Sequence, residues 1–108
     1  LAVGAERYDA AQSLARASRR LLPQVFDGCD VLIAPSAIGE APIGVQATGD
    51  PVFNRIWTLL RTPCVHVPTA AGPRGLPLGV TVAGPIGADR ATLTAADWIH
   101  AKIGLTLQ

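Results

Sequence analysis

The 108-residue sequence has no methionine, a single lysine, and only two tryptophans, one tyrosine and two phenylalanines. A complete primary translation product begins with methionine, so we expect this chain to be processed or to be part of a longer one. Nine basic and eight acidic residues nearly balance, and no basic cluster surrounds the few aromatic side chains. These features give no reason to expect nucleic acid as a partner.

Long apolar runs are also missing. The longest uncharged stretches, such as residues 75–88, are interrupted by Gly and Pro and are too short to span a bilayer. No basic-then-apolar leader is visible at the start of the chain. We therefore expect no membrane association.

Cysteine is scarce. Cys29 and Cys64 lie far apart and match no paired-ligand zinc spacing. Each adjoins an apolar run, which favours a reduced and buried thiol over a disulfide. The sequence therefore predicts no metal, no cofactor and a cytoplasmic location. Eight arginines against one lysine, with much alanine, are typical of a GC-rich bacterial source.

What is present indicates a folded unit. Hydrophobic residues make up 49% and charged residues 16% of the chain, which excludes a disordered segment. The length suffices for one compact domain. Hydrophobic periodicity, together with Gly and Pro punctuation, predicts six elements. These are helices over residues 6–25, 51–60 and 88–103, and strands over 30–35, 64–67 and 78–83.

The connections between these elements predict the topology. The short link between the last two strands requires an antiparallel hairpin. The first two strands are joined through a helix, which indicates a parallel βαβ unit. The fold class is thus α/β, a mixed sheet with flanking helices. All three strands are apolar on both faces and the first and third are expected to have open edges, which is typical of one end of a larger sheet.

Candidate catalytic residues are few. Ser36 is the one serine at a strand end, but no Lys or His is spaced in the sequence to activate it. His66 lies inside an apolar strand, which favours a hydrogen-bonded structural histidine over a general base or ligand. His100 and Lys102 suit the end of the last helix. The residues alone therefore predict a non-catalytic α/β unit.

Three segments together resemble the C-terminal region of the amidase-signature family. They are residues 29–36 (CDVLIAPS), residues 54–58 with 62–68 (NRIWT and TPCVHVP), and residues 75–80 (GLPLGV). The order and spacing of these segments cover nearly the whole chain. Two departures stand out: Thr81 occupies a position where the family often has Gln, and Arg61–Thr62 replaces a pair that usually contains Gly.

The resemblance implies amide hydrolysis by a Ser–cis-Ser–Lys triad, with backbone N–H groups stabilising the oxyanion. In the family all three catalytic residues lie upstream, and none maps onto this chain. Residues 1–108 would then be a single C-terminal segment of an amidase domain, inactive alone, whose partners are the N-terminal part and a small-molecule amide. The residues expected to line the substrate pocket are Pro35, Ser36, Asn54, Trp57 and Pro63.

Two alternatives remain from the residues. A free-standing, non-catalytic binding or assembly module would hide its apolar sheet faces in a homo-oligomer. An independent hydrolase would use Ser36 as its nucleophile.

Overall fold

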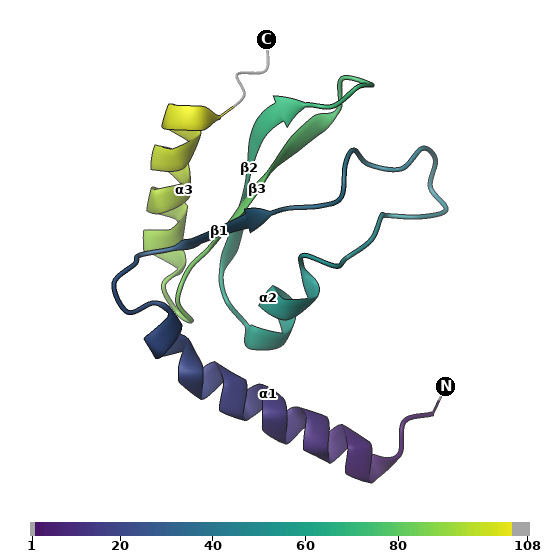
Figure 1. The fold of residues 1–108 in the computed structure, drawn as a ribbon, viewed down its shortest axis with the longest axis vertical. Coiled ribbons are helices and arrows are strands. Elements are labelled where there is room, and N and C mark those ends of the chain that lie inside the picture. Colours follow the sequence, from purple (N-terminus) through teal and green to yellow (C-terminus); the bar gives the residue numbers. More distant parts are fainter. Residues whose placement is uncertain (1, 105–108) are drawn as a thin grey trace.

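The protein is described by a computed structural model that covers residues 2–104. Its elements follow the predicted order of helix, strand, helix, hairpin and helix. They are α1 (Ala5–Val25), β1 (Leu32–Pro35), α2 (Arg55–Leu60), β2 (Cys64–Ala71), β3 (Pro77–Ala83) and α3 (Asp89–Ile103). α3 packs on the long β2–β3 hairpin, β1 pairs with the β3 side of that hairpin, and α1 extends away from the sheet (Figure 1).

The three strands form one sheet in the order β1-β3-β2. Both pairings are antiparallel, with Leu32 and Cys64 each opposite Ala83. The predicted hairpin and the α/β class are confirmed, whereas the described strands form no mixed sheet. β1 and β2 do run in the same direction, as their helical connection predicts, but β3 lies between them. The open edges are therefore β1 and β2, and the third strand is central.

β2 is longer than its apolar run predicts. Its pairing with β3 continues past Pro68 through a β-bulge to Ala71, which lies opposite Pro77. The Gly72 N–H then donates to the Leu76 carbonyl at 2.8 Å and closes the turn. Backbone pairing with β3 thus extends the strand into a segment whose side chains alone predict a loop.

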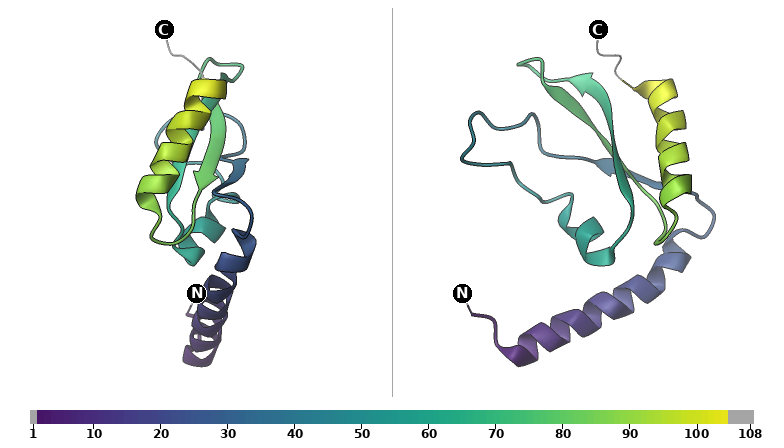
Figure 2. Two further views of the ribbon diagram at one scale, coloured as in Figure 1. Left: turned by 90° about the vertical axis from the view of Figure 1, so that its left-hand side faces the viewer. Right: turned by 180° about the vertical axis from the view of Figure 1, so that it is seen from behind.

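The two faces of the sheet are covered differently. Alternation along the strands places Val67 and Val82, which are 2% and 0% exposed, on one face. Ala96 and Ile99 of α3 pack against them. On the other face Leu32 contacts a small cluster formed by Leu22, Phe26 and Leu60, from the end of α1 and from α2. The principal core therefore lies between the sheet and α3, and Figure 2 shows α3 running along this face of the sheet.

α1 buries little of its predicted apolar stripe. Leu14, Leu21 and Val25 are 69%, 55% and 51% exposed, and the buried residues of the helix are Ala15 and Leu22. The helix continues through Pro23, because loss of one N–H donor near the helix end removes only one hydrogen bond. The Arg19 guanidinium donates twice to the Leu59 carbonyl, at 3.0 and 2.7 Å. α1 is thus fixed at its C-terminal half only.

The long loop after β1 is attached to the hairpin turn through Glu40. Its carboxylate accepts hydrogen bonds from the Arg74 Nε–H at 2.8 Å and from the backbone N–H groups of Arg74 and Leu76. The Arg74 guanidinium also donates to the Ala41 carbonyl. Chiefly through the Arg74 side-chain hydrogen bond, the pKa of the Glu40 carboxyl is held below its ordinary value.

The helix predicted over residues 51–60 becomes regular at Arg55. The Asp50 carboxylate accepts from the Val52 N–H at 3.0 Å in the turn that precedes α2, but α2 has no side-chain cap, so the prediction that Asp50 caps the helix is wrong.

Both cysteines are free, as predicted, but both are exposed, so the prediction of burial is wrong. Cys29 lies in the turn after α1, and Cys64 begins an edge strand on the sheet face that α3 does not cover. Among residues 2–104 no helix is both long and apolar enough to cross a membrane.

Candidate functional site

Ser36 lies directly after β1, where its N–H donates to the Gly79 carbonyl at 3.1 Å. This hydrogen bond extends the β1–β3 pairing by one residue. Because side chains alternate along a strand, Ser36 projects from the sheet face opposite α3. The strand end therefore presents a hydroxyl group on the polar side of the sheet.

The Ser36 hydroxyl has two side-chain partners. Its Oγ lies 2.6 Å from His66 Nδ1 and 3.0 Å from Thr81 Oγ1. Thr81 is 5% exposed, while Ser36 is half-buried and His66 is exposed. When neutral His66 carries its proton on Nε2, Ser36 donates to Nδ1 and Thr81 donates to Ser36. The His66 Nε2–H is then free to donate a hydrogen bond to a group that lies over this sheet face.

Gly79 allows Ser36 and His66 to meet. The two residues lie at opposite edges of the sheet, and strands two positions apart are separated by about 10 Å. Gly79 of the central strand lies between them, and a Cβ there would come within 2.7 Å of His66 Cε1 and would also strike the Val67 carbonyl oxygen. The imidazole therefore occupies the space that a larger side chain would fill.

Asn54 connects this cluster to α2. Its Nδ2 donates to the Ser36 carbonyl at 2.9 Å. Asn54, Trp57 and Pro63 also line a single cavity of about 380 Å³. The Trp57 indole Nε1 is buried and has no hydrogen-bond partner among the described residues. Four of the five residues predicted to line a pocket thus lie in one neighbourhood.

Pro35 does not join them. It lies opposite Val80 in the register, so its side chain is directed to the α3 face and away from Ser36. Its effect on the site is limited to fixing the backbone before Ser36.

The sequence analysis did not predict that Ser36 and His66 lie close together. The expectation that no histidine lies near Ser36 is wrong, because β3 brings the two edge strands to a common glycine. His66 is a hydrogen-bonded edge histidine, as predicted. The alternation of side chains along β2 would have helped, because it places His66 on the sheet face opposite to that of Val65 and Val67.

The Ser36–His66 pair lacks part of what a catalytic triad needs. No carboxylate among residues 2–104 is hydrogen-bonded to His66, so nothing in this part of the chain orients the imidazole as a base. The same residues contain no group of three or more His, Cys, Asp or Glu side chains placed to hold a metal ion. The cluster therefore resembles a polar pocket wall more than a complete active site.

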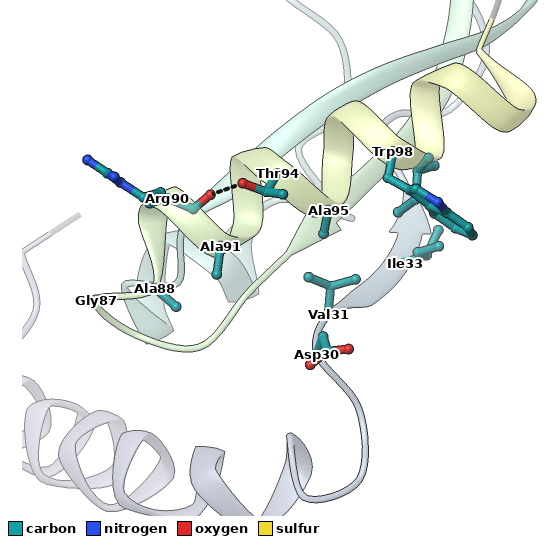
Figure 3. Close-up of a pocket in the computed structure, with 11 residues that line it drawn as sticks. Asp30, Val31, Ile33, Gly87, Ala88, Arg90, Ala91, Thr94, Ala95 and Trp98 are labelled. Carbon is teal, nitrogen blue, oxygen red and sulfur yellow. Dashed lines mark hydrogen bonds between the residues drawn. The ribbon is translucent and has the colours of Figure 1, made fainter.

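A second concavity lies on the α3 side of the sheet. It is an open groove of about 1010 Å³ between β1 and α3. Figure 3 shows Val31 and Ile33 facing Ala91, Ala95 and Trp98 across it. Ile33 is 55% and Trp98 64% exposed. The groove is apolar and offers few of the convergent polar groups that orient a substrate.

Comparison with known proteins gives relatives much longer than this chain. It is 28% identical over 112 residues to a mitochondrial glutamyl-tRNA(Gln) amidotransferase subunit from Mus musculus, covering 91% of this chain and 21% of that protein. The Homo sapiens protein of the same name is 27% identical with the same coverage. The Xenopus tropicalis protein is 29% identical over 79% of this chain and 19% of its own length. No family model matches the chain.

The fold matches one part of an amidase structure. A crystal structure of an amidase superposes with a TM-score of 0.78 at 24% sequence identity, over 94% of this chain and 26% of the other. The resemblance to the amidase-signature family is confirmed, and the chain corresponds to the C-terminal part of such proteins. It spans about a fifth of the length of the curated relatives it matches.

Proposed function

We propose that this chain is the C-terminal portion of an amidase that hydrolyses a carboxylic amide by a Ser–cis-Ser–Lys mechanism. All three catalytic residues belong to the remainder of the protein, and residues 1–108 act as one unit that completes the sheet and contributes to the substrate pocket. The substrate is a small linear amide. The enzyme works in the cytoplasm of a GC-rich bacterium, without metal or cofactor.

The observation that carries this proposal is the polar cluster of Ser36, His66 and Thr81 on an incompletely covered sheet face. Thr81 is buried, Ser36 is half-buried and His66 is exposed, so the cluster presents hydrogen-bonding groups at the surface of this sheet face. The chain spans 21% of one relative and 26% of the amidase structure, and we propose that the additional residues of the longer protein cover this face. The cluster then becomes an interior wall that can hydrogen-bond a substrate.

The pocket residues have distinct roles in this proposal. Ser36 and His66 present hydrogen-bonding groups, Asn54 fixes the Ser36 backbone, and Trp57 and Pro63 form an apolar wall. Pro35 holds the strand end without touching the substrate.

The apolar groove of Figure 3 is a place for the N-terminal part to pack. A free-standing assembly module is less favoured, because the relatives that this chain matches are larger amide-handling proteins.

One observation favours a second candidate function. The 2.6 Å separation of Ser36 Oγ and His66 Nδ1 is within the range of a nucleophile–base pair. On this reading the chain would hydrolyse amides or esters by itself, with Ser36 as nucleophile.

Ammonia release from acetamide and butyramide separates the two functions. We expect the longer natural protein to release ammonia and residues 1–108 alone to release none. Ser36→Ala in the longer protein should raise KM while leaving measurable turnover, because Ser36 is a pocket residue. Turnover by residues 1–108 that Ser36→Ala abolishes would establish the second candidate, and a longer protein that hydrolyses no amide would overturn the first.

A further inference from the structure

The Thr81 hydroxyl gives the hydrogen bonds of the polar cluster a direction. Thr81 is 5% exposed, and Ser36 Oγ, at 3.0 Å, is the one hydrogen-bond partner of its hydroxyl among residues 2–104. A hydroxyl group has one hydrogen to donate, and leaving a buried O–H without an acceptor costs free energy. Thr81 therefore donates to Ser36.

The donor role of Thr81 determines which nitrogen of His66 carries the proton. Because the Ser36 oxygen accepts from Thr81, its own hydrogen is available to donate, and His66 Nδ1 lies 2.6 Å away. Nδ1 then acts as an acceptor, so the proton of the neutral imidazole resides on Nε2. The reverse order, from His66 to Ser36 to Thr81, would leave the Thr81 hydrogen buried without an acceptor.

The surroundings of His66 keep the imidazole neutral and in place. An imidazolium would have to donate from Nδ1, which reverses the order of the hydrogen bonds. Within the described part of the chain no ion pair includes His66, so no carboxylate favours the charged form. Gly79 provides the space for the ring, since a Cβ there would come within 2.7 Å of His66 Cε1. His66 is thus a neutral donor in a defined position.

The Nε2–H of His66 remains an unshared donor. No group in residues 2–104 accepts from it, and the imidazole is exposed on the sheet face that α3 does not cover. In the proposed enzyme this face is a wall of the substrate pocket, where a few placed polar groups orient the ligand. An uncharged oxygen suits this donor. A carboxylate suits it less, because a nearby negative charge favours the imidazolium.

We infer that His66 is a specificity-determining residue that donates its Nε2–H to an uncharged oxygen of the amide substrate, and that Thr81 is the positioning residue that selects this tautomer through Ser36. This inference rests on the proposed function. It assigns to the substrate an ether, hydroxyl or second carbonyl oxygen in addition to the amide that is cleaved. Purely aliphatic amides and acidic amides are then poorer substrates.

Matched amides that differ by one ether oxygen test the role of His66 in the longer protein. Methoxyacetamide pairs with butyramide, and methoxypropanamide pairs with pentanamide. In His66→Phe, which keeps a ring and removes the donor, the ratio of kcat/KM for the ether amide to that for its aliphatic partner should fall about 3- to 10-fold in at least one pair, the effect of one neutral hydrogen bond. His100→Phe, which removes the exposed histidine of α3, should leave the ratios unchanged.

The positioning role of Thr81 has its own variants and its own readout. Thr81→Val keeps the shape of the side chain and removes the hydroxyl, so it should lower the same ratio, whereas Thr81→Ser keeps the hydroxyl and should retain it. Nitrogen NMR of histidine-labelled protein in mildly alkaline solution reports the tautomer, and the His66→Phe spectrum assigns the signal. We expect the Nε2–H form in wild type and in Thr81→Ser, and a mixture of tautomers in Thr81→Val.

These measurements separate the inference from the proposed function. An Nε2–H tautomer that Thr81→Val removes supports the positioning role even if the longer protein hydrolyses no amide. Amide hydrolysis with the same ratios in wild type and His66→Phe, in both pairs, overturns the contact with substrate and leaves the amidase proposal intact. An Nδ1–H tautomer in wild type overturns the direction of the hydrogen bonds on which the inference depends.

Discussion

Gly79 shows how one residue can decide whether a site forms. Its lack of a side chain lets His66 cross the central strand and reach Ser36. The neighbouring Thr81 supplies the buried hydroxyl that completes the cluster. A single methyl group at position 79 would therefore affect both the stability of the hairpin and the geometry of the polar cluster.

We expect Gly79→Ala to lower the free energy of unfolding by about 1 to 3 kcal/mol, the usual cost of overpacking. The new Cβ meets the Val67 carbonyl oxygen, which belongs to the backbone and cannot rotate away, and the His66 ring. Urea denaturation measures the change. The double variant Gly79→Ala/His66→Ala should recover only part of it, because the clash with Val67 remains. A single variant as stable as wild type would contradict this account of the glycine.

Residue-level reasoning from the sequence named residues that the structure brings into one neighbourhood, but it missed the contact between Ser36 and His66. Ser36 was identifiable because it is the one serine at the end of an apolar strand, whereas Asn54 and Trp57 were named from their positions in the resemblance to the amidase-signature family. Their proximity to one another depends on β3 lying between β1 and β2. Sequence pattern gives strand direction through connection lengths, but it carries no information on which strand takes the central position.

At the scale of elements, strong hydrophobic periodicity predicted that a helix or strand exists better than it predicted which of its faces is buried. The pattern of α1 correctly gave a helix, yet Leu14, Leu21 and Val25 are exposed, because the described residues provide no surface that packs against them. β2 was predicted too short, since backbone pairing extends it where its side chains carry no signal. Local pattern specifies an element, while its neighbours determine its ends and its buried face.

The attachment of the long loop to the hairpin predicts a dependence on pH. The pKa of Glu40 is lowered in the folded protein, so its stabilising contribution is complete above the ordinary glutamate pKa of about 4.3. The contribution is lost as the pH falls through the lowered pKa of the folded state. Amide hydrogen exchange at Arg74 and Leu76, whose N–H groups donate to Glu40, should therefore show weaker protection in acid.

A matched variant checks the assignment to this carboxyl group. Glu40→Gln keeps the shape of the side chain and removes its charge, so protection at Arg74 should be low at neutral pH and should change little on acidification. Protection that still falls in acid in Glu40→Gln would assign the effect to another group.

At the scale of the whole molecule, the chain is flat and open. Its extents are 51 × 39 × 17 Å and its radius of gyration is 16.4 Å, whereas about 13 Å is typical of a globular chain of this length. Its accessible surface of 7945 Å² exceeds the roughly 5,700 Å² expected of a compact 11.2 kDa protein. The excess is the surface that the proposed remainder of the amidase would bury.

The exposed stripe of α1 gives this proposal a direct test. In the longer protein we expect Leu14→Ala to lower the free energy of unfolding by about 2 to 3 kcal/mol, although Leu14 is 69% exposed here. Leu22→Ala, at a position only 6% exposed, is the matched reference and should cost a similar amount. A Leu14→Ala change within about 0.5 kcal/mol, the range of ordinary surface substitutions, would mean that nothing covers this side of α1.

The central position of β3 has a consequence for biosynthesis. Both of its neighbours precede it in the chain, so within residues 2–104 β1 and β2 have no strand to pair with on a ribosome until residues 77–83 have emerged. The local hairpin can then form quickly, whereas the β1 pairing closes a much longer loop and has a higher contact order. Until that moment the β1 segment depends on chaperones, or on strands made before it, to stay out of aggregates.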